Sequence, residues 1–159
     1  MIIWLNGVVG SGKSAVGAAL ACLLPGGHFI DGDDHAGPAD LPDRWRWRIA
    51  LLTVLTLARR RPPARIVVAY PLDSGSFRIL RSRCARVRRR LVVINLATPL
   101  PVVLRGRGGR VLSRDERRRV REMVGEGYCR RRFATMTLCN ALPPPARTAR
   151  VILHRLRAA

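Results

Sequence analysis

The chain has 159 residues, of which 48% are apolar and 25% are charged, and its formal net charge at pH 7 is +20. This length fits one ordinary domain, and the apolar fraction excludes a disordered chain. The longest apolar run, Ile49 to Ala58, has ten residues and is too short to span a bilayer, so we expect no membrane segment.

Short apolar runs and segments of helical composition alternate along the chain. In chain order, the expected elements are strand 1–6, helix 13–24, strand 28–31, helix 40–61, strand 64–70, helix 74–90, strand 91–96, a short helix within 98–110, helix 113–128, strand 135–140 and helix 146–159. This alternation predicts one α/β domain over residues 1–159, a three-layer α/β/α sandwich around a five-stranded parallel sheet. The loops after residues 6, 31, 70 and 96 should share one edge of that sheet, where ligands bind.

Basic residues outnumber acidic ones by thirty to ten, and Lys13 is the only lysine. The excess has two explanations, an anionic or nucleic-acid partner and the arginine-favouring codons of a GC-rich genome. Four cysteines, at 22, 84, 129 and 139, show no CxxC spacing, so we expect reduced thiols and no zinc site. The glycine-rich stretch that begins at Gly7 leaves no room for a secretory leader, and we expect a cytoplasmic protein.

A phosphate-binding pattern, G-x-x-x-x-G-K-[ST], lies between the first expected strand and helix. Its residues, with two that lie inside the loop, are Gly7, Gly10, Ser11, Gly12, Lys13 and Ser14. Glycines let backbone N–H groups surround phosphate oxygens, and the helix that follows points its N-terminus at the same anion. A lysine ammonium is compact enough to reach the β- and γ-phosphates, whereas a guanidinium is broader. The pattern predicts that the loop binds a nucleoside triphosphate and that Ser14 binds Mg²⁺.

Three carboxylates, those of Asp31, Asp33 and Asp34, follow the second expected strand in the stretch FIDGDDH. Carboxylates that lie together repel one another, so their clustering needs a reason. Two reasons are a magnesium ion with its water and a base that accepts the proton of a substrate hydroxyl. A turn rich in aspartate that ends the strand is the structural alternative.

The stretches GSGKS, FIDGDDH and LPDRWRW together resemble the gluconate kinases. Shikimate kinases carry a related F-x-D-x-D, and the opening MIIWLNG resembles the tunicamycin-resistance ATP-binding proteins. This resemblance implies a P-loop fold like that of the nucleoside monophosphate kinases. It also implies that Asp31 holds magnesium, that Asp33 contacts the substrate and acts as the base, and that Asp34 and His35 line the substrate site. The segment between FIDGD and the tryptophans is shorter than in gluconate kinases, so the acceptor stays open.

Two arginine-rich stretches resemble further parts of the same kinases. LRGRGGRVLS, between two expected helices, resembles the lid, which we place at about residues 105–112; Arg107 and Arg110 would bind the phosphates, and Arg110 would act in catalysis. EGYCRRRFA resembles the region after the lid helix, where Tyr128, Arg130 and Arg132 are candidate contacts to an anionic substrate. Trp45 and Trp47 are candidates to stack on a ligand, with a core or dimer contact as the alternative for Trp45.

The leading hypothesis is an enzyme, an ATP- and Mg²⁺-dependent kinase that phosphorylates a hydroxyl of a small metabolite or antibiotic. Nucleotide or nucleic-acid phosphorylation is a second hypothesis, which the net charge of +20 suggests, but few aromatic residues are present to stack on bases. A third is an ATP-binding resistance module that binds an antibiotic and leaves it unchanged. The protein would be a monomer or a homodimer.

Overall fold

The structure is a computed structural model that describes residues 1–35, 37–38, 40–59, 65–106, 111–141 and 144–158. Within α2, the side chains of residues 43, 44, 47, 58 and 59 also lie outside the described part. Arg107 and Arg110 of the expected lid, and Trp47, therefore receive no structural account.

One five-stranded sheet forms the centre of the molecule, with all neighbouring strands parallel and in the order β2-β3-β1-β4-β5. The strands are β1 (Ile2–Asn6), β2 (Gly27–Asp31), β3 (Arg65–Ala69), β4 (Leu91–Ala97) and β5 (Met136–Cys139). The helices are α1 (Lys13–Leu23), α2 (Asp43–Arg59), α3 (Ser74–Arg86), α4 (Leu100–Leu104), α5 (Arg114–Gly125) and α6 (Pro145–Arg157), with short 3₁₀ turns η1 (Asp33–His35) and η2 (Tyr128–Arg130). The predicted parallel α/β architecture is confirmed.

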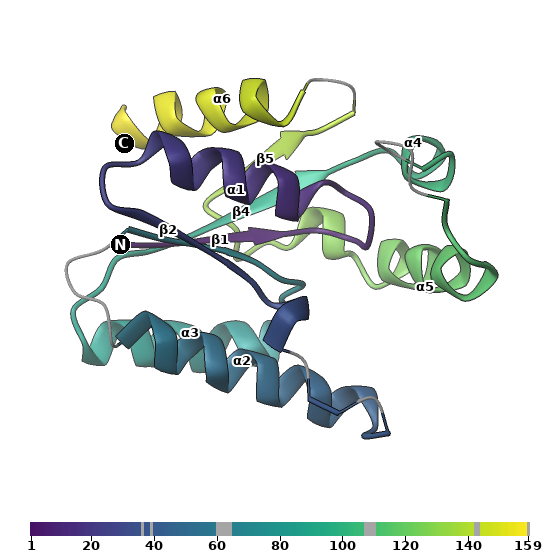
Figure 1. The fold of residues 1–159 in the computed structure, drawn as a ribbon, viewed down its shortest axis with the longest axis horizontal. Helices are drawn as coiled ribbons and strands as arrows, with labels where there is room; N and C mark the ends of the chain where they lie inside the picture. The colour runs from purple at the N-terminus through teal and green to yellow at the C-terminus, as the bar shows by residue number, and fades with distance from the viewer. Residues whose placement is uncertain (36, 39, 60–64, 107–110, 142–143, 159) are drawn as a thin grey trace.

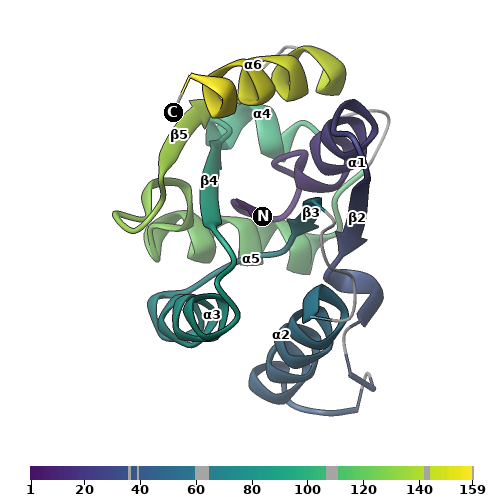
Figure 2. The same cartoon turned by 90° about the vertical axis from the view of Figure 1, so that its left-hand side faces the viewer.

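Helices cover both faces of the sheet (Figures 1 and 2). Successive side chains of a strand point to opposite faces, so Trp4 packs in a cluster with α2 and α3, while Leu5 packs in a cluster with α1 and α6. Both residues are fully buried. The strands are continuous apolar runs because helices cover both faces of the sheet.

A third cluster lies beyond the carboxyl ends of the strands, where α4 and α5 stand (Figure 1). Val8, which follows β1, is buried there against Val103 of α4 and Val120 of α5. A capping box begins α5: the Ser113 hydroxyl accepts the backbone N–H of Glu116, and the Glu116 carboxylate accepts the backbone N–H of Ser113.

Two expectations are wrong in detail. The helix expected over 74–90 ends at Arg86, because Arg88 adopts a left-handed φ of 51°. The N–H of Arg89 then bonds the Cys84 carbonyl at 2.9 Å, and the helix closes in the pattern usually made by glycine. A core role for Trp45 is also wrong, since its side chain is 47% exposed.

A buried hydrogen-bond network centred on Asn6 joins residues at the carboxyl ends of the strands. The amide of Asn6 donates to the Asn95 side chain at 2.9 Å and to the Tyr128 carbonyl at 3.0 Å, and its oxygen accepts the N–H of Leu72 at 2.8 Å. Buried polar groups that are satisfied in this way fix one arrangement of the elements that they join. The network therefore fixes β1, β4, η2 and the start of α3 relative to one another.

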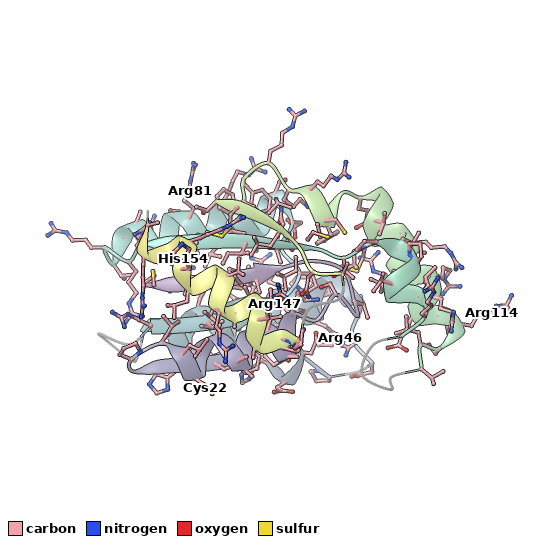
Figure 3. The ribbon with its side chains drawn as sticks, turned by 90° about the horizontal axis from the view of Figure 1, so that it is seen from above. Cys22, Arg46, Arg81, Arg114, Arg147 and His154 are labelled. Atoms are coloured by element: carbon pink, nitrogen blue, oxygen red, sulfur yellow. The ribbon has the colours of Figure 1, made fainter. Side chains whose placement is uncertain are left out.

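Among the described residues, no helix combines the length and the hydrophobicity that crossing a membrane requires. Arginine side chains such as Arg81 and Arg114 project outward from the helices (Figure 3). In α3, Leu80 and Cys84 are the buried residues, and the arginines of this helix form a solvated face opposite them.

Candidate phosphate and acceptor site

The loop between β1 and α1 has the backbone conformation that its glycines allow. Gly10 and Gly12 have φ values of 74° and 89°, which side-chain-bearing residues rarely adopt. Gly12 is the N-cap of α1, and no side chain caps the helix there. An anion is the ligand that the dipole of a helix favours at its N-terminus.

Residues that directly follow β4 and β5 hold the loop in place by hydrogen bonds. The Ser11 carbonyl accepts hydrogen bonds from the Thr98 hydroxyl at 3.0 Å and from the Asn140 amide at 2.7 Å. Thr148 of α6 in turn donates to the Asn140 oxygen at 2.9 Å. All four residues are buried. Sequence reasoning missed Thr98 and Asn140; the available signal was that each is a polar residue directly after an apolar strand.

The Lys13 side chain folds back over the phosphate loop that precedes it. Its side chain is 8% exposed, and its ammonium donates to the Val8 carbonyl at 2.9 Å. Because Val8 is itself buried between α4 and α5, the base of the expected lid packs directly on the loop. A shift of α4 or α5 would therefore move Val8, whose carbonyl is hydrogen-bonded to the ammonium group of Lys13.

The aspartates lie at the same edge of the sheet as this loop. Ala69 of β3 pairs with Leu5 of β1 on one side and with Asp31 of β2 on the other. Asp31 is therefore level with the end of β1, at about two strand spacings, or roughly 10 Å. The Asp31 carboxylate accepts the N–H of Asp33 at 3.2 Å. Asp33 and Asp34 are exposed, and His35, the last residue of η1, is partly buried.

Gly32 lets the chain turn sharply between Asp31 and Asp33. A Cβ atom at this position would collide with the ring of Tyr70, which is buried beside it. Any other residue would displace either the ring or the turn, and the carboxylates would move with it. The glycine of FIDGDDH is thus required by packing.

The donors at this edge fit a magnesium ion that also binds phosphate. Ser14 is exposed in the first turn of α1, and Asp31 supplies one carboxylate. Magnesium typically takes one or two carboxylates together with water and phosphate oxygens. Within the described part of the chain, no three His, Cys, Asp or Glu residues converge as a metal cluster. The expected pair, Ser14 and Asp31, offers hard oxygen donors of the kind that magnesium binds.

Asp73, the acid nearest the end of β3, has a structural role. Its carboxylate caps α3 by accepting the N–H groups of Gly75 and Ser76 at 2.7 and 2.9 Å and the Ser76 hydroxyl at 2.8 Å. Burial alone would raise the pKa of this carboxyl, but the hydrogen bonds from Ser76 and Gly75, together with the charge of Arg131, hold the pKa below its ordinary value.

Of the three consecutive arginines after Cys129, the structure packs Arg131 against the protein. Its guanidinium carbon lies 4.3 Å from the centre of the Tyr128 ring, and its carbonyl accepts the Asn95 amide at 3.1 Å. Arg130 and Arg132, two of the three residues expected from the sequence, are exposed, whereas the third, Tyr128, is buried. Burial, followed by the nearby Asp73 carboxylate, raises the pKa of Tyr128.

No protein-family model matches the chain, and no curated protein matches its sequence. Solved structures do resemble it over nearly the whole length. A gluconokinase from Sinorhizobium meliloti is 26% identical with a TM-score of 0.70, and the match covers 97% of this chain and 91% of that one. A shikimate kinase from Acinetobacter baumannii, in complex with shikimate, is 20% identical with a TM-score of 0.69 and coverages of 99% and 93%.

The tunicamycin resistance protein of Deinococcus radiodurans is 22% identical with a TM-score of 0.64, and the match covers 98% of this chain and 94% of that one. The three groups that the sequence motifs resemble are thus all found among the structural neighbours. The chain has the fold of the P-loop kinases of small molecules.

Proposed function

We propose that the protein is a kinase that transfers the γ-phosphoryl group of ATP to a hydroxyl of a small metabolite or antibiotic. The observation that carries this proposal is the register of β1, β3 and β2, which sets Asp31 level with the start of the phosphate loop. A loop shaped for phosphates and a group of carboxylates at one edge are what phosphoryl transfer to an alcohol requires.

The roles follow from the chemistry of each side chain. Lys13 leaves the Val8 carbonyl, 2.9 Å away, to bind β- and γ-phosphate oxygens. Ser14 and Asp31 would hold Mg²⁺. Mg·ATP, when bound, supplies the phosphoryl group and part of the charge neutralisation. Asp33 is exposed and can therefore orient an acceptor hydroxyl and accept its proton.

The remaining proposed residues bind and enclose the substrates. Asp34 and His35 contact the hydroxylated acceptor, and Arg130 and Arg132 contact an anionic group on it. Arg107 and Arg110, in a lid at about residues 105–112, close over the phosphates and exclude water. Val8 of the phosphate loop packs against α4 and α5. These helices flank the proposed lid, so the packing supports a coupling between the loop and the lid. All four cysteines are free, which supports a cytoplasmic setting.

An ADP-release assay with a panel of acceptors tests the proposal. The panel contains sugar acids, shikimate-like alcohols, nucleosides, nucleoside antibiotics and short oligonucleotides. We expect acceptor-dependent ADP release with a small molecule, and mass spectrometry should find one added phosphoryl group on it. Phosphorylation of the oligonucleotides alone would make the protein a nucleic-acid kinase. An antibiotic that is bound tightly and recovered unchanged would make it a binding module instead.

A further inference from the structure

The outward side of α3 and the turn that follows it carry positive charge with no acidic residue nearby in the chain. Neither aspartate nor glutamate occurs between residues 74 and 114. Asp73, which precedes this stretch, uses its carboxylate to cap α3. We call the exposed arginines of this region the α3 arginine surface; they are Arg78, Arg81, Arg83, Arg86, Arg88 and Arg90.

The density of this charge exceeds what the arginine-rich composition of the chain produces elsewhere. Seven of the thirteen residues 78–90 are arginine, against four of the thirteen in α6, which also lacks acids. In α5 the arginines are interspersed with acids and pair with them, as Arg119 does with Glu126 at 2.9 Å. Arg83 and Arg86 of α3 instead stand three residues apart, and like charges at this spacing destabilise a helix. A partner of negative charge would offset this repulsion.

The α3 arginine surface extends away from the phosphate loop. β3 and β4 both run parallel to β1, so α3, which connects them, runs back toward the edge where the strands begin. The end of α3, with Arg86, and the following turn, with Arg88, therefore lie at the edge opposite Lys13. α3 lies on the α2 side of the sheet (Figure 2), and its buried residues are Leu80 and Cys84. The proposed kinase reaction thus gives these arginines no role.

The side chains around the arginines favour a duplex phosphate backbone over other anionic partners. Protein interfaces are built around apolar or aromatic anchors, whereas the exposed large apolar residues of 74–90 are Ile79 and Val87. A helix that binds a membrane directs its apolar face to lipid, but Leu80 of α3 packs in the core. Single strands require aromatic side chains on which bases stack, and the one aromatic residue of α3, Phe77, is stacked on Phe133.

We propose that the α3 arginine surface binds the phosphate backbone of duplex DNA, independently of the kinase reaction. With 13 residues, α3 is about 20 Å long and, with its side chains, about 10–12 Å across. The major groove of B-form DNA is about 12 Å wide and admits such a helix, whereas that of duplex RNA is deep and narrow. Arg78 and Arg83 lie about 140° apart around the helix, so their guanidinium groups reach phosphates on the two sides of the groove.

Fluorescence anisotropy with a labelled DNA duplex of about 20 base pairs, two helical turns, tests the proposal on the full chain. The test variant replaces three arginines of α3 by glutamine, which retains helix propensity: Arg78→Gln, Arg83→Gln and Arg86→Gln. A second variant places lysine at the same three positions and keeps the charge. Circular dichroism and urea unfolding establish that each variant is folded.

The matched control lies on α6, on the opposite face of the sheet (Figure 2). It replaces three exposed arginines by glutamine and so removes the same net charge: Arg150→Gln, Arg155→Gln and Arg157→Gln. A difference between the α3 and α6 variants therefore reports on the place of the charge and not on its total.

We expect the parent to bind the duplex with an affinity that falls steeply with salt, by about 0.9 in the logarithmic slope for each phosphate contact. The α3 glutamine variant should lose about 3 from that slope and bind roughly 10²-fold more weakly at about 0.1 M salt. The lysine variant and the α6 control should keep the slope of the parent. Saturating Mg²⁺ with a non-hydrolysable ATP analogue should leave the DNA affinity unchanged.

Four outcomes overturn the proposal: no binding of the duplex by the parent at about 50 mM salt, equal losses in the α3 and α6 glutamine variants, tighter binding of duplex RNA or of a single strand of the same sequence, and displacement of the DNA by polyglutamate or by the ATP analogue. A protein that never binds the analogue would contradict the proposed kinase function, whereas the comparison of the α3 and α6 variants would still test the surface.

Discussion

The Thr98 hydroxyl donates a 3.0 Å hydrogen bond to the backbone carbonyl of Ser11, inside the phosphate loop. Asn140 donates to the same carbonyl from the neighbouring strand end. The conformation of a glycine-rich loop is costly in entropy unless other groups fix it. Two buried donors on one carbonyl supply that constraint, so residues outside the loop fix its conformation.

Thr98→Val tests this support, because valine keeps the shape and removes the donor. Losing one partner of a buried hydrogen bond costs about 1–3 kcal/mol in the free energy of unfolding, and the affinity for the ATP analogue should fall as well. Thr56→Val is the matched control, since the Thr56 hydroxyl bonds the Leu52 carbonyl on the exposed side of α2. Urea unfolding and calorimetry measure the two quantities; equal behaviour of the two variants would remove the proposed role of Thr98.

Asp33→Asn should separate chemistry from binding. The amide keeps the size of the carboxylate but cannot accept the acceptor proton, so kcat should fall by about 10²–10⁴, while the nucleotide affinity stays unchanged. Asp34→Asn is the control at the adjacent exposed carboxylate, and it should raise KM for the acceptor with kcat retained. Steady-state kinetics with the identified acceptor decide the assignment, which is wrong if the two variants show the same profile.

The Asp73→Asn substitution should lower the free energy of unfolding in a pH-dependent way. The folded-state pKa of Asp73 lies below its ordinary value, the net result of burial, which raises it, and of the Ser76 and Gly75 hydrogen bonds, which outweigh burial. The ionised carboxylate therefore stabilises the fold fully above the ordinary pKa of about 3.9, and this contribution disappears as the pH falls through the folded-state pKa. Asparagine keeps a capping oxygen, so the variant reports mainly on charge.

The free energy of unfolding, measured with urea between pH 7 and about pH 2, should be lower for Asp73→Asn at neutral pH and converge with that of the parent in acid. Asp115→Asn is the control, because its carboxylate pairs with Arg118 where both side chains are more than 70% exposed and such pairs contribute little. A difference for Asp73→Asn that stays constant across this range would show that the charge does not act as described.

The sequence allowed the architecture to be predicted because each element carries a local signal. The strands are continuous apolar runs, and Ser113 with Glu116 marks the start of α5. The end of α3 could not be predicted, since Arg88 adopts a left-handed conformation that arginine rarely favours. Such a conformation depends on the hydrogen bonds that the fold makes available, which propensity does not encode.

The phosphate loop was predictable from its spacing, but its supports were not. Asn6, Thr98 and Asn140 are separated by tens of residues, and only the strand order brings them to one edge. Likewise, the meeting of Cys129 and Cys139 in one cleft depends on the direction in which an edge strand points its side chains. Contacts between residues distant in the chain follow from topology, which a single sequence specifies only through the complete fold.

Binding of a magnesium–ATP analogue to the parent, Lys13→Ala and Lys13→Arg tests the central claim most directly. Lys13 is the only lysine in a chain with many arginines. Its ammonium lies in the loop, 2.9 Å from the Val8 carbonyl. A bulkier guanidinium should not be accommodated there, so both variants should lose nucleotide binding, and turnover should fall by about 10²–10³ or more. If either variant binds the nucleotide as tightly as the parent with full turnover, the phosphate loop is not the active site.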